Sequence, residues 1–139
     1  MQARDMSVLA RFRKESPFEA RDLAREIEVK IIRLCMNEKY YPKRYRYTIS
    51  QSLIDSALRM SDYITAANAL PNNEQHREQR EKYQQNAYMM CEVILRKLDL
   101  SERLEFSIPE GLLTEIIEMI LKEEKAITGW INASKKKKT

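Results

Sequence analysis

The stretch from Lys39 to Tyr47 reads Lys-Tyr-Tyr-Pro-Lys-Arg-Tyr-Arg-Tyr and interleaves four cations with four tyrosines around one proline. Cations neutralise phosphates, and aromatic rings offer faces on which bases stack. A turn between helices can present both kinds of side chain without competing with a packed core. The pattern therefore predicts a nucleic-acid-binding surface. The expected contacts are Lys39, Tyr40, Tyr41, Lys43, Arg44, Tyr45 and Arg46.

The same residues also have a structural interpretation. Aromatic side chains beside a helix start often pack as hydrophobic staples, and lysine and arginine simply keep a loop solvated. Composition alone does not separate these two interpretations of the tyrosines.

A second basic feature is the lysine run near the C-terminus, which consists of Lys135, Lys136, Lys137 and Lys138. A run of this kind can contact phosphates, but tails of like charge are also typical of solvated, disordered segments. We include the run as a weaker candidate contact.

Residues for catalysis are scarce. The single histidine, His76, lies in a polar stretch without a cysteine or a second histidine at metal-ligand spacing, which favours a solvated surface residue. The Glu-x-x-His pairs of bundle di-metal sites are absent from the sequence, and two glycines cannot build a phosphate-binding loop. The sequence predicts a protein that is not an enzyme and has no cofactor or metal.

Length and composition indicate one all-helical domain. A chain of 139 residues is the size of an ordinary domain. Only two glycines and four prolines interrupt a composition rich in helix formers. Cys35 and Cys91 lie in apolar helical patterns, so we expect buried, reduced thiols. Neither a membrane span nor a signal peptide is evident, and a cytoplasmic location is expected.

Charge is distributed unevenly along the chain. Residues 1–59 carry 13 Lys or Arg and 8 Asp or Glu, whereas residues 60–134 carry 8 and 13. This asymmetry is compatible with a polyanion on one surface and a basic protein partner on another.

Four long helices can be drawn from caps and apolar periodicity. Capping boxes are predicted at Ser16–Glu19, Thr48–Gln51 and Ser107–Glu110, and an asparagine after Pro71 caps the remaining helix. The first helix should run to about Glu38, the second should begin near Thr48, and the third should end near Leu98, before a connector over residues 99–106. The fourth should fray after Asn132. The apolar positions expected to face the core are Leu23, Ile27, Ile31, Leu34, Ile49, Leu53, Ala57, Met60, Ile64, Ala67, Tyr83, Ala87, Met90, Ile94, Leu95, Leu98, Leu113, Ile116, Ile117, Ile120, Ile127 and Ile131.

Similar helix lengths and short connections favour an antiparallel up-down-up-down four-helix bundle. We divide the chain into a basic N-terminal segment, residues 1–15, which has room for a short extra helix, a bundle over residues 16–133, and a lysine tail, residues 134–139. Trp130 is expected in the core, with Gly129 permitting close backbone approach; the alternative is that it anchors a neighbouring subunit. Five methionines are expected as core fillers: Met36, Met60, Met89, Met90 and Met119.

Two segments resemble a known bundle superfamily. The turn over residues 41–49 is similar to the first inter-helix junction of proteins encoded in 23S rRNA intervening sequences and of the accessory variability determinants (Avd) of diversity-generating retroelements. The run Ile127-Thr128-Gly129-Trp130-Ile131-Asn132, followed by lysines, resembles the ending of the Avd branch.

The resemblance implies a non-enzymatic subunit that works beside a reverse transcriptase, binds template RNA or cDNA largely non-specifically, and supports mutagenic retrohoming. It also implies a ring-like homo-oligomer, a pentamer, with basic surface for nucleic acid. The polar opening of the third helix, Glu74 to Gln85, departs from a continuous basic belt. The alternative is a helical-bundle scaffold whose acidic second half docks a basic protein and which has no direct nucleic-acid role.

Overall fold

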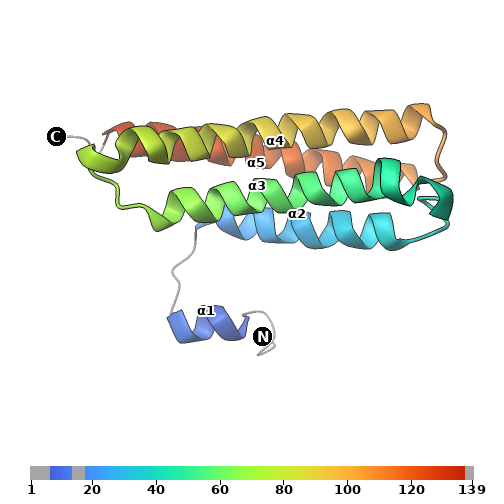
Figure 1. The fold of residues 1–139 in the computed structure, drawn as a ribbon, viewed down its shortest axis with the longest axis horizontal. Coiled ribbons are helices and arrows are strands. Elements are labelled where there is room, and N and C mark those ends of the chain that lie inside the picture. Colours follow the sequence, from blue (N-terminus) through green and yellow to red (C-terminus); the bar gives the residue numbers. More distant parts are fainter. Residues whose placement is uncertain (1–6, 14–17, 137–139) are drawn as a thin grey trace.

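Four long antiparallel helices form the body of the protein in a computed structural model that describes residues 7–13 and 18–136 (Figure 1). A short N-terminal helix, α1, stands away from them in the same view. The helices are α1 (Val8–Arg13), α2 (Glu19–Met36), α3 (Gln51–Ala69), α4 (Arg77–Arg103) and α5 (Glu110–Lys136).

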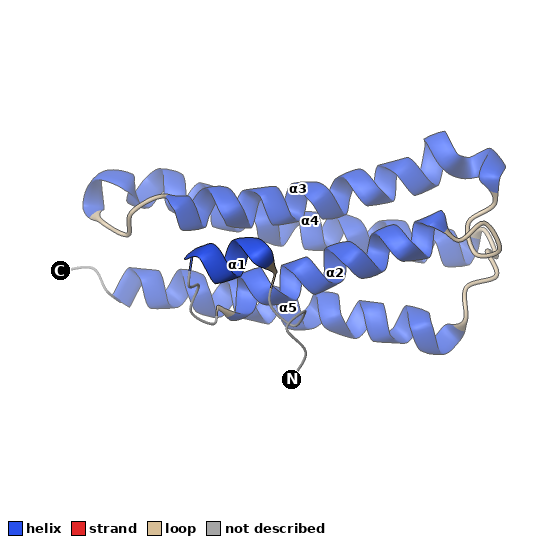
Figure 2. Ribbon diagram, turned by 90° about the horizontal axis from the view of Figure 1, so that it is seen from below, coloured by secondary structure: helices blue, strands red, loops and turns tan. Residues whose placement is uncertain are grey.

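The predicted fold class is confirmed. Each long helix packs against two neighbours: α2 contacts α3 and α5, and α4 contacts the same two helices on their other side (Figures 1 and 2). No strand occurs in the described parts of the chain. Among those same residues, no helix is both long and apolar enough to span a membrane.

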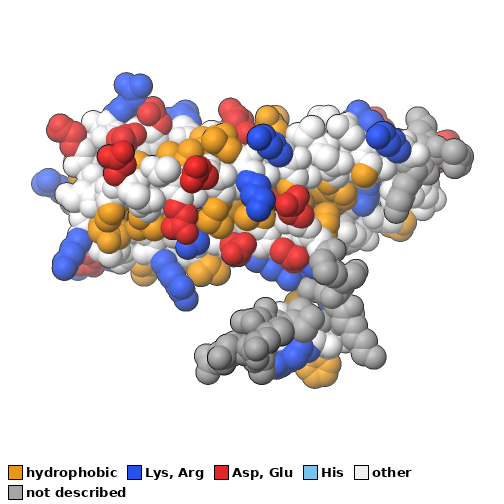
Figure 3. All heavy atoms as spheres, turned by 180° about the vertical axis from the view of Figure 1, so that it is seen from behind, with side chains coloured by type: hydrophobic (Ala, Val, Ile, Leu, Met, Phe, Trp, Pro, Cys, Tyr) orange, Lys and Arg blue, Asp and Glu red, His pale blue; other side chains and the backbone are white. Residues whose placement is uncertain are grey.

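The core consists of the apolar positions that recur at helical spacing. Sixteen of the twenty-two core positions named from the sequence are buried, and so are Cys35 and Cys91. The other six, Ile49, Tyr83, Met90, Leu95, Ile117 and Ile131, are half-buried. Burial raises the pKa of the Cys35 thiol to about 12 and also raises that of Cys91, so both remain thiols at neutral pH. Charged side chains of both signs are interspersed over the outer surface, as one face shows in Figure 3.

The methionine prediction was right for Met60, which is fully buried, and wrong for two others. Met36 is 66% exposed because it ends α2 at the rim of the bundle, and Met89 is 57% exposed on the outer face of α4. Met90 and Met119 are partly buried against the core.

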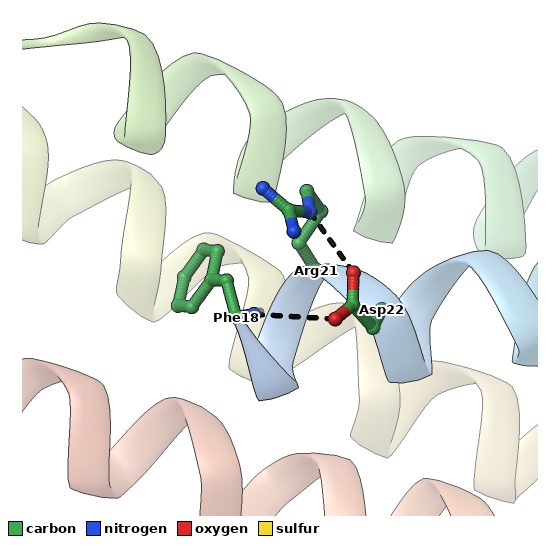
Figure 4. Close-up of polar contacts among 3 residues, drawn as sticks. All are labelled: Phe18, Arg21 and Asp22. Carbon is green, nitrogen blue, oxygen red and sulfur yellow. Dashed lines mark hydrogen bonds and ion pairs between the residues drawn. The ribbon is translucent and has the colours of Figure 1, made fainter. Parts of the chain in front are cut away.

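The first turn of α2 is held by Asp22. Its carboxylate accepts hydrogen bonds from the Phe18 backbone N–H at 3.2 Å and from Arg21 Nε at 3.0 Å (Figure 4). Phe18 is therefore the N-cap residue, whereas Ser16 and Pro17 of the predicted capping box lie outside the described residues. The helix ends at Met36 because Asn37 turns extended and its side chain accepts from the Lys39 N–H at 2.9 Å.

The predicted asparagine cap of the third helix is confirmed at Asn73. Its Oδ1 accepts from the His76 backbone N–H at 3.1 Å and opens a 3₁₀ turn, Glu74–His76, that continues into α4. The His76 ring nitrogen Nδ1 also lies 2.8 Å from Asn73 Oδ1, so the only histidine helps to build this cap.

Helix α4, the third long helix, runs five residues past its predicted end at Leu98, to Arg103, and closes in a Schellman motif. The Phe106 N–H donates to the Ser101 carbonyl at 3.2 Å and the Glu105 N–H donates to the Glu102 carbonyl at 2.9 Å. Glu105 takes the left-handed conformation, with φ 62°, that glycine usually supplies. The sequence signal for this end was missing because the position holds glutamate.

The last helix begins at Glu110, two residues later than the predicted cap at Ser107 would place it, with the Pro109 carbonyl accepting from the Leu113 N–H at 3.0 Å. It also does not fray after Asn132. It continues to Lys136 because its last turns are attached to α4. Arg80 donates to Ser134 Oγ at 2.6 Å, and Lys135 pairs with Glu81 at 3.7 Å.

Trp130 closes this end of the bundle. Its ring packs edge-on against Phe18, with centroids 4.8 Å apart, and the Arg80 guanidinium lies 5.4 Å from its centroid. The tryptophan is half-buried against the core, in line with the prediction, but the reason given for it was wrong. No neighbour lies within 4 Å of a Cβ built on Gly129, so this glycine allows no close approach.

Candidate nucleic-acid interface

The candidate interface is the junction between α2 and α3, at the end of the bundle opposite the C-terminus (Figure 1). After Asn37, the N–H groups of Tyr40 and Tyr41 donate to the Asn37 carbonyl at 3.0 and 2.9 Å. Pro42 is extended, and helical structure starts directly after it with a 3₁₀ turn, Lys43–Tyr45, and a π-helical turn, Arg46–Ser50.

The α-helix α3 begins at Gln51, close to the predicted start near Thr48. The prediction missed the two helical turns before it. Helical geometry begins at Lys43, five residues before Thr48, because proline has no N–H to lose and presets a compatible φ before a first turn. The Thr48 hydroxyl donates to the Tyr45 carbonyl at 3.4 Å. Lys43, Arg44 and Arg46 consequently lie in a helical corner, whereas Lys39 lies in the turn before Pro42.

Tyr41 cannot stack on a base, which corrects the prediction for this residue. Only 1% of it is exposed, and its hydroxyl donates to Ser101 Oγ of α4 at 2.8 Å. Its ring meets Phe106 edge-on at a centroid distance of 5.1 Å. Tyr41 is apolar enough to enter the core and finds a polar partner there, so the structural interpretation holds for it.

Tyr40 and Tyr45 are half-buried and pack partly inward. Tyr40 lies against the hydrophobic core. The Tyr45 ring lies 5.0 Å from that of Phe106, and the Arg44 guanidinium lies 5.6 Å from its centroid. These two rings contribute to the corner itself and leave only part of their surface for a ligand.

Tyr47 is the aromatic residue that the predicted contact set missed. It is 84% exposed. It lies in the π-helical turn, Arg46–Ser50, and its ring is open to solvent. No sequence signal indicated the π-helical turn.

The four cations of the junction, Lys39, Lys43, Arg44 and Arg46, are all exposed. One guanidinium nitrogen of Arg46 lies 3.5 Å from the Glu38 carboxylate, which is itself exposed. An ion pair in water of this kind is weak, so the pair leaves Arg46 able to exchange Glu38 for a phosphate.

The described part of the lysine run does not join this site. Lys135 and Lys136 are in the last turn of α5, at the other end of the bundle, and Lys137 and Lys138 lie outside the described residues. A helix of 27 residues, such as α5, is about 40 Å long, so the two basic clusters lie far apart within one protomer. Only the junction residues are brought together.

Acidic residues border the basic corner. The connector between α4 and α5, which carries Phe106, also carries the exposed Glu105, and the exposed Glu102 and Glu110 lie in the adjoining ends of α4 and α5. The four cations of the junction therefore form a local patch.

A buried acidic pair on α5 was also missed from the sequence. Glu123 is fully buried, and neither of its carboxylate oxygens has a hydrogen-bond partner among the described residues. Desolvation, followed by the charge of Glu19, raises its pKa to about 9. Burial and then the neighbouring Glu92 raise the pKa of Glu124 to about 7. Glu123 is therefore protonated at neutral pH.

These carboxyls do not make a metal centre. No group of three or more His, Cys, Asp or Glu side chains within residues 7–13 and 18–136 is arranged to hold a metal ion. Glu123 is instead a polar defect in an apolar layer, next to Cys91, whose thiol pKa it helps to raise.

No protein-family model matches the chain, and no curated protein matches it either. The family resemblance of the junction and of the C-terminal run therefore remains a prediction.

Proposed function

We propose that this protein is a non-enzymatic accessory subunit of a diversity-generating retroelement, which binds the reverse transcriptase and the template RNA or cDNA and supports mutagenic retrohoming. The observation that carries the proposal is the exposed cationic corner that follows Pro42. Lys43, Arg44 and Arg46 are accessible there, and Tyr47 presents an open ring beside them. Cations next to an exposed aromatic ring are the combination that binds single strands without sequence preference.

The proposal includes a ring-like homo-oligomer, a pentamer. One corner offers only a few phosphate contacts, so a single protomer binds weakly at physiological salt. A ring presents several copies of the corner to one strand. Once the first corner is bound, each further contact with that strand is intramolecular, so the overall affinity increases.

The test is a salt titration of binding to a structured RNA and to single-stranded DNA, with the mass in solution measured on the same preparation. We expect a multimer whose affinity falls steeply with salt. Reversing the charges of Lys43, Arg44 and Arg46 to glutamate should weaken both nucleic acids equally and flatten the slope of log K against log salt by about three per protomer.

A matched control reverses three exposed cations on the sides of the bundle, Arg59, Lys122 and Lys125. It changes net charge by the same amount and should leave most of the salt slope intact. Equal losses in both triple variants would remove the corner as the site, and a monomer indifferent to both nucleic acids would remove the function.

A second candidate is a protein-interaction scaffold without a direct nucleic-acid role. It is favoured by one observation, the inward packing of Tyr41 and Tyr45 against Phe106. In that case the acidic second half of the chain docks a basic partner such as a polymerase. Capture of purified reverse transcriptase by both triple variants, with no RNA binding by the unmodified protein, would favour this scaffold.

A further inference from the structure

The inner side of the basic corner contains a cavity of about 230 Å³. The end of α2, the loop before Pro42 and the first turns of α3 enclose it. The residues that matter for its chemistry are Met36, Tyr41, Lys43, Arg46, Gln51 and Ile54. Glu38, Pro42, Ser50 and Cys35 complete the lining.

The lining is divided by chemistry. Met36 and Ile54 supply apolar surface, and Lys43 and Arg46 supply positive charge on the same concavity. Tyr41 also lines the cavity but is almost fully buried. Such a combination suits a ligand that has an apolar ring and an adjacent anionic group. Phosphate alone would use only the cations, and a purely apolar ligand would leave the cations unused.

The size of the cavity limits the ligand. Sites for drug-sized molecules usually occupy about 300–1,000 Å³, so this smaller cavity holds a group on the scale of one heteroaromatic base. A folded peptide segment or a helix does not fit into it.

The π-helical turn explains why the site exists here. Arg46 and Ser50 begin and end this turn, and both line the cavity. Turns of this type are unfavourable relative to regular helix and are frequent at functional sites. The turn directs Arg46 toward the cavity while Tyr47, the next residue, points to solvent with 84% of its surface exposed.

We propose that this cavity takes one unstacked nucleotide of a bound single strand, with the base against Met36 and Ile54 and its phosphate on Lys43 and Arg46. This inference rests on the proposed nucleic-acid-binding function and adds a base-dependent site to it. Only one base enters, and its hydrogen-bonding edge meets few polar groups. The site therefore distinguishes a strand that carries a base from an abasic strand better than it distinguishes one base from another.

Glu38 competes with a phosphate for Arg46. Its carboxylate lines the cavity and lies 3.5 Å from an Arg46 nitrogen, where an incoming phosphate would replace it. The guanidinium has five N–H donors, so it can begin to bind phosphate before it leaves Glu38.

The experiment compares a short oligothymidine with an abasic strand of equal length and charge, and follows the methionine methyl signals by NMR. The Met36 signal is assigned through its loss in Met36→Ala. Met89 is the internal control, because it is similarly exposed but lies on α4 away from the cavity.

We expect a saturable shift of the Met36 methyl signal with oligothymidine, a much smaller shift with the abasic strand, and no shift of Met89 with either. Met36→Ala should lower the preference for the base-bearing strand by at least about threefold, whereas Met89→Ala should not change it. Tyr47→Ala should weaken binding yet keep the Met36 shift, which separates the cavity from stacking on the exposed ring.

The outcomes distinguish the two proposals. If both strands bind in a salt-dependent way but Met36 responds to both equally, or to neither, the cavity site is wrong and the phosphate-binding function stands. If neither strand binds at low salt, both the function and the cavity site are overturned.

Discussion

Each end of the bundle has an arginine beside an aromatic ring, but the two arginines have different roles. At the α3–α4 end, Arg80 lies 5.4 Å from the Trp130 centroid, and at the α2–α3 junction Arg44 lies 5.6 Å from that of Tyr45. Arg80 is only 8% exposed and donates to the Leu70 carbonyl at 3.3 Å and to Ser134. Arg44 is exposed.

Burial, and not the cation–aromatic pair itself, therefore decides what each arginine does. Desolvation lowers the pKa of Arg80. Through its hydrogen bonds to the Leu70 carbonyl and to Ser134, Arg80 holds the end of α3 and the end of α5 together. The junction cations remain in water and keep their charge available for a ligand. A residue pattern that predicts nucleic-acid binding can equally belong to a structural clamp.

The largest difference is expected between two junction tyrosines. Tyr41→Ala should destabilise the protein by about 3–5 kcal/mol, because it empties a buried aromatic site and removes the Tyr41–Ser101 hydrogen bond. Tyr47→Ala should leave stability within about 0.5 kcal/mol and weaken nucleic-acid binding instead. Urea unfolding and strand binding on both variants check this contrast, which fails if the two variants lose equal stability.

The two arginines should differ next. Arg80→Met should cost about 3 kcal/mol, since the Leu70 carbonyl and Ser134 lose a charged donor. Arg44→Met should have little effect on stability and should reduce affinity for RNA. Thermal unfolding and a binding titration measure both. A stable Arg80→Met variant would mean that the clamp does not hold this end of the bundle.

Between the two ends, Glu123 should show the effect of burial through pH. Its pKa is 4.5 in the unfolded chain and about 9 in the fold, so the folded protein retains a proton that the unfolded chain releases. The stability of the unmodified protein therefore falls as pH rises from 4.5 toward 9. The stability of Glu123→Leu does not fall with pH in this way, so at pH 7 this variant should be about 1–3 kcal/mol more stable than the unmodified protein.

The gap between Glu123→Leu and the unmodified protein should be small below pH 4.5, widen with pH and level off above about 9, as measured by urea unfolding across that range. Glu118→Leu, on the exposed side of the same helix, is the matched control. A constant gap across the range would show that Glu123 is ionised in the fold.

The smallest effect is expected at Glu38. Glu38→Gln removes the carboxylate that lies 3.5 Å from Arg46, so affinity for single strands should rise about two- to fivefold at low salt, with less gain at high salt. Glu26→Gln makes the same charge change on the exposed face of α2 and is the control. Equal gains in both variants would mean that only net charge matters.

Much of the fold was predictable because apolar residues at helical spacing must face a common core. That logic placed Ile27, Met60, Ile94 and Ile120 correctly without any knowledge of their neighbours. Helix ends were less predictable. The ends of α4 and α5 depend on Glu105 in a left-handed conformation and on Arg80 reaching Ser134, and neither has a local signal.

The candidate site was predictable only in part. Exposure of Lys43, Arg44 and Arg46 follows from their charge, since burying an unpaired cation is costly. The fate of the tyrosines does not follow from local sequence, because a phenol ring suits a core as well as a surface. Tyr41 enters the core because Ser101 and Phe106 meet it from the far end of α4, sixty residues away in the case of Ser101.

By itself, then, the sequence determined the helical class, the inward positions and the basic character of the junction, because periodicity and charge act locally along a chain. Only the tertiary structure decided which aromatic rings stay open, where Arg46 and Met36 meet around a cavity, and which carboxyl is forced to keep its proton. Those features depend on desolvation and on contacts between distant helices, which exist only once the bundle has closed.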